Sequence, residues 1–258
     1  MKRPLILLCL LLSWTAAYAI NIANLSEAVD VAGKQRMYTQ RMLKDYAMIG
    51  MENRFGDPEK DLKTTIRNFE EHLDALLAFN KDPATEASLK KVKQMWKPIK
   101  RSLRKHPDKA HAAKLQADLD ALLKQSNEAV ELFAKQTGKI SGEIINISGR
   151  QRMLSQRMAS LYMLKAWGIN DPKFKDKMNQ AMQLFKTSHD RLKQSSLNTP
   201  KINNLLKKVE HSFQFFDIMN RSKSKFIPAL IYKKSNDILK DMNTVTGLYA
   251  ARETKERQ

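Results

Sequence analysis

The chain has 258 residues with a formal net charge of +19, and it contains only 8 glycines and 8 prolines. Leucine, lysine, alanine, methionine and glutamine abound, and no stretch alternates as a strand does, so the expected fold class is all-α. The single cysteine, Cys9, excludes an intrachain disulfide, and the large positive charge predicts an anionic partner.

Residues 1–19 have the pattern of a signal peptide. Lys2 and Arg3 give a positive start, residues 5–12 are a short apolar run, and Ala17-Tyr18-Ala19 has the small-x-small form of a signal-peptidase site. We therefore expect cleavage after Ala19 and export to the periplasm; an uncleaved anchor is the alternative. Because an exported protein is a poor candidate for nucleic-acid binding, we expect the anionic partner to be of another kind.

The following helices are predicted in chain order. The first covers residues 24–52. Gly-Asp-Pro at 56–58 and Asp-Pro at 82–83 have the form of helix starts, and they predict helices over 58–79 and 83–104.

A fourth helix begins near residue 107, and it has no clear stop before residue 169. The simplest prediction is one helix of roughly 60 residues that both halves of the chain share. A bend near Gly138 to Gly142 is the alternative, because glycines weaken a helix there. Three more helices are predicted over 172–197, 200–222 and 228–253.

Two stretches of the chain are nearly the same text, VAGKQRMYTQRMLKDYAMIGM at 31–51 and ISGRQRMLSQRMASLYMLKAWGI at 147–169. The repeat, 116 positions apart, predicts two tandem four-helix bundles, residues 20–137 and 138–258. Outside the motif, Ser126-Asn127 matches Ser235-Asn236 at a smaller offset, which predicts a shorter connection before the last helix. The repeated motif residues are Gly33, Gln35, Arg36, Met37, Gln40, Arg41, Met42 and Tyr46, copied as Gly149, Gln151, Arg152, Met153, Gln156, Arg157, Met158 and Tyr162.

Part of the motif falls on a helix face turned away from the apolar stripe, which implies a second contact surface. This face carries a glycine, where another helix or a ligand can approach the backbone, and an arginine, whose planar donors suit an oxyanion. A small anion held between two such arginines would offset their repulsion, and its binding would shift helix packing. The residues of this face are Gly33, Arg36, Met37 and Gln40, with the copies Gly149, Arg152, Met153 and Gln156.

Both motifs resemble the signature helix of the NarX/PilJ-type sensory domain, which nitrate/nitrite sensor kinases share with type IV pilus methyl-accepting chemotaxis transducers. The shared pattern is a small residue, Gly, two residues, Arg-Met, three residues and Arg, found at 32–41 and 148–157. The resemblance implies an extracytoplasmic bundle that binds nitrate or nitrite at a dimer interface.

Carried over residue by residue, the resemblance gives anion contact to Arg36 and Arg152, with close approach at Gly33 and Gly149. Met37, Gln40, Met153 and Gln156 would serve the interface or the packing, and Arg41 and Arg157 would hold structure or partners. Unlike the family's sensors, this chain is expected to be exported with two sensory units and without a membrane anchor.

Two functions are compatible with the sequence. The first is an exported sensor-type protein that binds a small oxyanion and relays its occupancy to a membrane sensor kinase or chemoreceptor. A continuous long helix would hold the two motifs apart and favour a homodimer. The alternative is a basic envelope scaffold that docks anionic polymer, lipid or an acidic partner, with the motif serving only in helix pairing. The four motif arginines are then ordinary ion-pair residues.

No catalytic pattern is present in the sequence. It has no glycine-rich phosphate loop, no nucleophile elbow and no di-iron glutamate–histidine pattern, and its five histidines lack metal-ligand spacing. We therefore expect a protein that is not an enzyme and that uses neither a cofactor nor a metal.

Overall fold

The computed structural model describes residues 20–138, 140–221 and 227–255, so the predicted signal peptide and its cleavage site lie outside the described residues. The described part consists of eight helices and contains no strand, which confirms the all-α class. The helices are α1 (Leu25–Gly50), α2 (Pro58–Phe79), α3 (Pro83–Leu103), α4 (Lys109–Thr137), α5 (Ile140–Ala166), α6 (Phe174–Lys193), α7 (Pro200–Arg221) and α8 (Pro228–Lys255).

Short polar side chains cap the first helices as their sequences predict. Asn24 accepts a hydrogen bond from the backbone N–H of Glu27 at 3.0 Å, at the start of α1. Asp57 and Asp82 accept similar bonds at the starts of α2 and α3, and each is followed by proline at the first helical position. Each cap satisfies a backbone donor that the first turn leaves free, so these helices begin within a residue of where they were expected.

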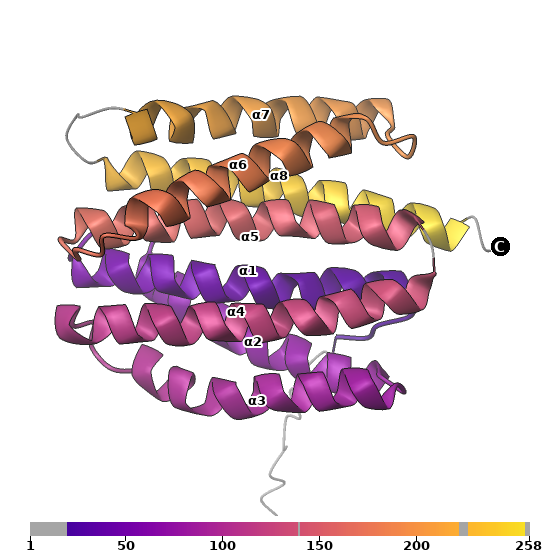
Figure 1. Ribbon diagram of the computed structural model, residues 1–258, viewed down its shortest axis with the longest axis horizontal. Helices are drawn as coiled ribbons and strands as arrows, with labels where there is room; N and C mark the ends of the chain where they lie inside the picture. The colour runs from indigo at the N-terminus through magenta and orange to yellow at the C-terminus, as the bar shows by residue number, and fades with distance from the viewer. Residues whose placement is uncertain (1–19, 139, 222–226, 256–258) are drawn as a thin grey trace, which may run out of the picture.

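The eight helices form two four-helix bundles that lie side by side (Figure 1). Helices α1–α4 make the first bundle, helices α5–α8 make the second, and α1 packs along α5 at the centre. The two central helices run parallel, since Gly33 lies opposite Gly149 and Gly50 lies against Trp167. α1 therefore has neighbours on most of its sides, which explains why it carries both an apolar stripe and a buried polar face.

The predicted shared helix of about 60 residues is wrong, because the chain reverses between α4 and α5. α4 ends at Thr137, and Gly138 follows in the left-handed conformation with φ of 64°, which glycine adopts at little cost. At Gly142 a Cβ atom would lie 2.1 Å from the Thr137 hydroxyl oxygen, so a second glycine lets the hairpin close. The reversal brings both motif helices together within one chain, so the condition that favoured a homodimer is not met.

The offset of 116 residues that relates the motifs is found again in the second and in the last helix of each bundle. Gln35 donates to the carbonyl of Phe69 and Gln151 donates to that of Phe185, both at 3.0 Å. The residues that bind Arg36 and Arg152 from α4 and α8 also differ by 116, as described below. The connection before α8 is accordingly no shorter than the one before α4, contrary to the prediction from the Ser-Asn pairs.

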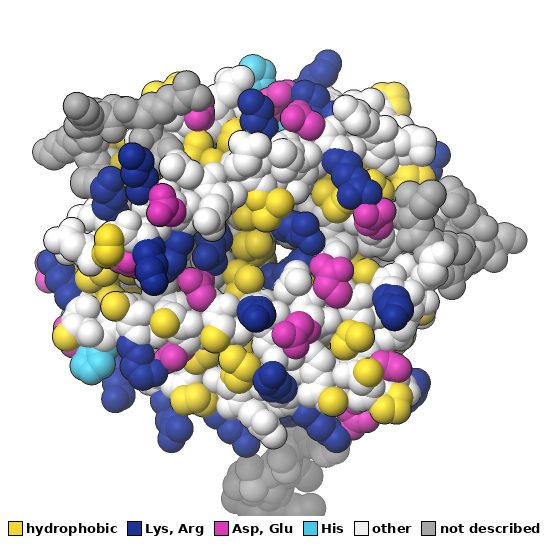
Figure 2. All heavy atoms as spheres, viewed as in Figure 1, with side chains coloured by type: hydrophobic (Ala, Val, Ile, Leu, Met, Phe, Trp, Pro, Cys, Tyr) yellow, Lys and Arg dark blue, Asp and Glu magenta, His cyan; other side chains and the backbone are white. Residues whose placement is uncertain are grey.

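The surface seen in Figure 2 mixes both signs of charge. Lysine and arginine side chains are scattered over this face with aspartate and glutamate between them, so the basic excess does not gather into one patch here. Among the helices of the described residues, none has a stretch both long enough and apolar enough to cross a membrane.

Candidate functional site

Two glycines create the point of closest approach between α1 and α5. A Cβ atom placed on Gly33 would lie 4.0 Å from the Cα of Gly149 and 3.1 Å from Nη2 of Arg152. A Cβ atom on Gly149 would lie 3.1 Å from the same nitrogen and 3.4 Å from Nη2 of Arg36. The missing side chains thus leave room in which two guanidinium groups share one small space.

Arg36 reaches from α1 toward both α4 and α5. Its Nη1 donates to the Asn127 side-chain oxygen at 2.7 Å, and its Nη2 donates to the Asn146 carbonyl at 3.2 Å. The side chain is fully buried. This arginine therefore lies inside the interface between the two bundles rather than on a solvated face.

Arg152 repeats this arrangement from the opposite side. Its Nη1 donates to the Asn243 side-chain oxygen at 3.1 Å, and its Nη2 donates to the Asp30 carbonyl at 3.2 Å. It too is fully buried. The two arginines and their partners are thus related by an approximate twofold axis that runs along the helix pair.

The symmetry breaks at one pair of equivalent positions, where α1 has Asp30 and α5 has Asn146. The Asp30 carboxylate lies 2.7 Å from Arg152 Nη1 and 2.9 Å from the Lys34 amine. Burial by itself would raise the pKa of Asp30, but the Arg152 and Lys34 cations hold that pKa below its usual value. Arg36 makes no ion pair with any described residue, and the carboxylate that acts on it is Glu131, which accepts a hydrogen bond from the Asn146 side chain at 3.2 Å.

The charge on Arg36 is poorly compensated. Burial lowers the pKa of its guanidinium, the cations of Arg150 and Arg152 lower it further, and Glu131 acts in the opposite direction. In addition, the buried Nε donors of Arg36 and Arg152 have no hydrogen-bond partner among the described residues. A buried cation with unsatisfied donors is costly unless something neutralises it, so the centre favours an anion.

The two glutamines of the motif tie helices together. Gln40 accepts from the Ser160 hydroxyl on α5 and donates to Asp120 on α4, both at 3.3 Å. Gln156 donates to the Ser235 carbonyl on α8 at 3.0 Å. These contacts join α1, α4, α5 and α8 next to the arginine pair.

The other motif residues lie away from the arginine pair. Arg41 forms an ion pair with Asp61, and Arg157 forms one with Asp120 at 2.7 Å. Met37 and Met153 are buried packing residues. The structure therefore brings Gly33, Arg36, Gly149 and Arg152 together and places the remaining candidates around them.

Several residues of the centre escaped sequence reasoning. Asp30 and Asn146 lie just outside the repeated text, and Asn127 and Asn243 are equivalent only at an offset of 116. Matching Asn127 to Asn236 instead concealed that pair. Aligning the last helices of the two bundles at the offset of the motif, 116 residues, is the signal that finds it.

No three histidine, aspartate or glutamate side chains lie together as a possible metal site within the residues that the structure describes.

Fold and site define a class: a duplicated helical-bundle protein whose equivalent first helices pair around buried arginines. The chain belongs to the PilJ family, the type IV pili methyl-accepting chemotaxis transducer N-terminal domain, which matches residues 21–130 and again 133–216. No curated protein and no solved structure matches the chain. The two matches confirm the PilJ resemblance in two tandem copies, while the likeness to nitrate sensors stays a prediction. The family is a sensory and signalling family rather than a catalytic one.

Proposed function

We propose that this protein is a periplasmic sensory protein that binds one small oxyanion of the nitrate or nitrite class between Arg36 and Arg152. Its occupied form would be read by a membrane chemoreceptor or sensor kinase. The observation that carries the proposal is the buried pair of guanidinium groups, of which only that of Arg152 is paired with a carboxylate, Asp30. Each bundle, residues 20–137 and 138–258, would supply one arginine and one glycine.

The chemistry of the centre suits a small planar anion. A guanidinium is a rigid fork of N–H donors, and hydrogen bonds between ionised groups are roughly twice as strong as neutral ones. An anion with several oxygens would accept from both arginines and would reduce their mutual repulsion. Gly33 and Gly149 keep the space beside these donors free of side chains.

Burial of the arginine pair supports a link between anion binding and the packing of α1 against α5. Both arginines are fully buried, so an anion enters only when α1 and α5 move relative to each other. A ligand that binds one packing of these helices better than another shifts the population of the two, which is how a bundle converts binding into a signal. Membership of a chemotaxis transducer family supports a chemoreceptor as the reader of that change.

Calorimetric titration of residues 20–258 with nitrate, nitrite, chloride and sulfate tests the proposal. We expect saturable heat that prefers one oxyanion and is lost in Arg36→Met. Asp30→Asn places in α1 the residue that α5 has at Asn146 and removes a competing carboxylate, so it should tighten binding by roughly tenfold. Arg191→Met is the matched control, because Arg191 forms an exposed ion pair with Glu143 and lies outside the centre.

Folded wild-type and Asp30→Asn proteins that both give no heat with any small anion would overturn the oxyanion site. The basic scaffold, which rests on the net charge of +19, would then be the better account. Salt separates the two functions, since binding of a polyanion to exposed lysines weakens steeply with ionic strength while a buried site is screened less.

A further inference from the structure

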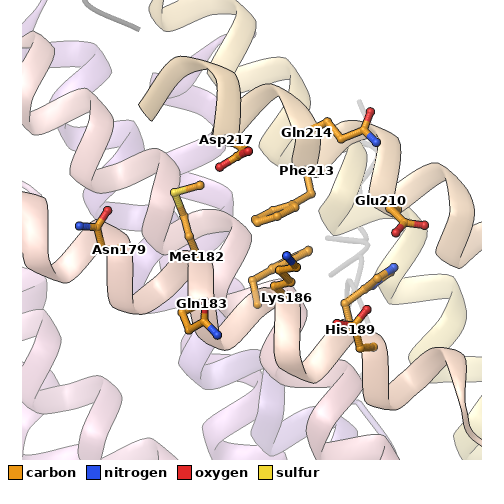
Figure 3. A pocket seen from close by; sticks show the side chains of 11 residues that line it. Asn179, Met182, Gln183, Lys186, His189, Glu210, Phe213, Gln214 and Asp217 are labelled. Atoms are coloured by element: carbon orange, nitrogen blue, oxygen red, sulfur yellow. The ribbon is translucent and has the colours of Figure 1, made fainter. Parts of the chain in front are cut away.

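A groove of about 630 Å³ lies between α6 and α7, on the second bundle and away from the arginine pair. Figure 3 shows Phe213 and His189 directed into this groove, with Glu210 beside His189 and Asp217 toward the other end. A volume of this size accommodates a small organic molecule.

Stacked rings form the apolar part of the groove. The rings of Phe185 and Phe213 are nearly parallel, with an interplanar angle of 8° and centroids 4.5 Å apart. His189 lies one turn further along the same face of α6, with its ring at 11° to that of Phe185 and the ring centroids 6.0 Å apart. Flat, parallel faces of this kind bind planar groups, and phenyl faces also attract cations.

His189 has a polar side chain in a buried position. It is only 4% exposed, and neither ring nitrogen has a hydrogen-bond partner among the described residues. The equivalent residue of the first bundle is Leu73, an ordinary core residue. Burial lowers the pKa of His189, so its neutral ring offers one donor and one acceptor. An unpaired buried polar side chain that lines a groove indicates a ligand contact.

The equivalent place in the first bundle has different side chains. There Phe69 packs against Trp96, whose indole N–H donates to Glu70 at 3.1 Å, and Lys100 also contacts Glu70. In the second bundle Phe213 takes the place of the tryptophan, and Lys186 takes the place of the glutamate. The larger ring and the acceptor that held it are both missing, so the second copy has a smaller aromatic ring and no buried indole hydrogen bond at this place.

The polar lining of the groove is acidic although the chain is strongly basic. Asp190, Glu210 and Asp217 line it, against a single lysine, Lys186. Glu210 also pairs with Lys193 at 3.1 Å, outside the lining. The excess of carboxylates beside aromatic faces selects for positive charge in a flat molecule.

We propose that the α6–α7 groove binds a small flat organic cation, an aromatic ring that carries an amine or amidine. The ring lies against Phe213, the cationic group faces the carboxylates of Asp190 and Glu210, and His189 supplies a hydrogen bond. The site is independent of the oxyanion centre and gives the second bundle a ligand of its own.

The test is an NMR titration of ¹⁵N-labelled residues 20–258 with benzamidine, the neutral isostere benzamide and the anionic benzoate. Benzamidine should give saturable shifts that concentrate on α6 and α7. Benzamide should bind at least roughly tenfold more weakly, because it lacks the charge, and benzoate should give no saturable shift.

Two variants replace a residue of the groove by its equivalent from the first bundle. Phe213→Trp fills it and His189→Leu removes the polar contact, so each should weaken benzamidine binding by at least roughly tenfold without lowering the melting temperature. Phe215→Trp is the matched control. Phe215 is on α7, as Phe213 is, but its ring lies under the amine of Lys234 and it does not line the groove.

Three results would overturn the proposal: no saturable benzamidine shifts in the folded protein, shifts scattered over the surface, or unchanged affinity in both variants. If one variant fails to fold, the other and the benzamide comparison still decide the outcome.

Discussion

Single glycines of this chain meet very different surroundings, and these surroundings decide which of them can be replaced. A Cβ atom on Gly50 would lie 2.1 Å from the Trp167 ring, which packs there edge to face with Tyr46. Gly247 sits inside α8 with no atom within 4 Å of such a Cβ. Glycine lowers helix stability at both positions, but only at Gly50 does the missing side chain make room for a neighbouring residue, Trp167.

The same substitution at these two glycines should therefore have opposite effects. Gly247→Ala should raise the free energy of unfolding by about 1 kcal/mol, because alanine has the higher helix propensity. Gly50→Ala should lower it by about 2 kcal/mol, because the methyl group displaces Trp167. Urea denaturation of both variants measures the difference, and equal effects would contradict the packing of Trp167 on α1.

His72 should make stability depend on acidity. Burial lowers its pKa to about 4; Lys34 and Arg152 lower it as well, Asp30 raises it, and Tyr38 packs against the ring. As the pH falls, a base whose pKa is lowered on folding becomes protonated in the unfolded chain before it becomes protonated in the folded chain. The fold therefore loses stability as the pH falls from about 6.5 toward 4.

His72→Phe removes this group and keeps an aromatic ring against Tyr38. Between pH 7 and pH 4.5 we expect the variant to lose about 2 kcal/mol less stability than the wild type, as measured by urea denaturation at both pH values. Parallel losses in the two proteins would show that His72 is readily protonated in the fold.

At the scale of elements, α1 and α5 are copies that have diverged toward their ends. α1 carries Lys44 and Asp45, both fully buried, where α5 carries Ser160 and Leu161. The Lys44 amine donates to Asn236 at 2.8 Å, lies 4.0 Å over the ring of Tyr232 and is 3.6 Å from Asp45. Burial raises the pKa of Asp45 and lowers that of Lys44, so the charged forms depend on each other.

A double-mutant cycle should expose this dependence. Lys44→Met leaves Asp45 buried without its counter-charge and should cost about 3 kcal/mol, whereas Lys44→Met with Asp45→Leu should cost about 1 kcal/mol or less. The penalty of Lys44→Met should grow from pH 5 to pH 8, because folding must then keep a proton on Asp45 that the unfolded chain has released. Additive costs in urea denaturation would contradict the pairing.

At the scale of the whole molecule, one chain places two copies of the same helix against each other. The first and second bundles meet through equivalent helices, and each arginine of the centre bonds to the other bundle. Joining two copies in one chain lets the halves differ. Asp30 opposite Asn146 is one result, and the α6–α7 groove is another.

Separate halves should therefore find each other. Coexpressed fragments 20–137 and 138–258 should elute as a 1:1 complex in size-exclusion chromatography with light scattering, because each alone would expose the face of α1 or α5. Gly149→Leu in the second fragment should abolish the complex, since its side chain would fill the space that the guanidinium groups use. Folded wild-type fragments that remain separate would contradict the interface.

Local chemistry explains what the sequence determined by itself. Caps such as Asn24, Asp57 and Asp82 act within four residues, so the starts of the first helices were predictable. The duplication and the identity of Arg36 and Arg152 as the repeated polar residues were equally visible, because they rest on repeated letters. The all-α class and the PilJ family followed from the same signals.

Only the tertiary structure decided how the two copies meet. Gly138 permits either a bent helix or a full reversal, and the reversal prevails because it buries the polar face of α5 against its copy on α1. Arg152 pairs with Asp30 and Arg36 forms no such ion pair among the described residues, a difference that depends on contacts across more than a hundred residues. Such contacts have no local signal, because they arise from packing between segments that are distant in the chain.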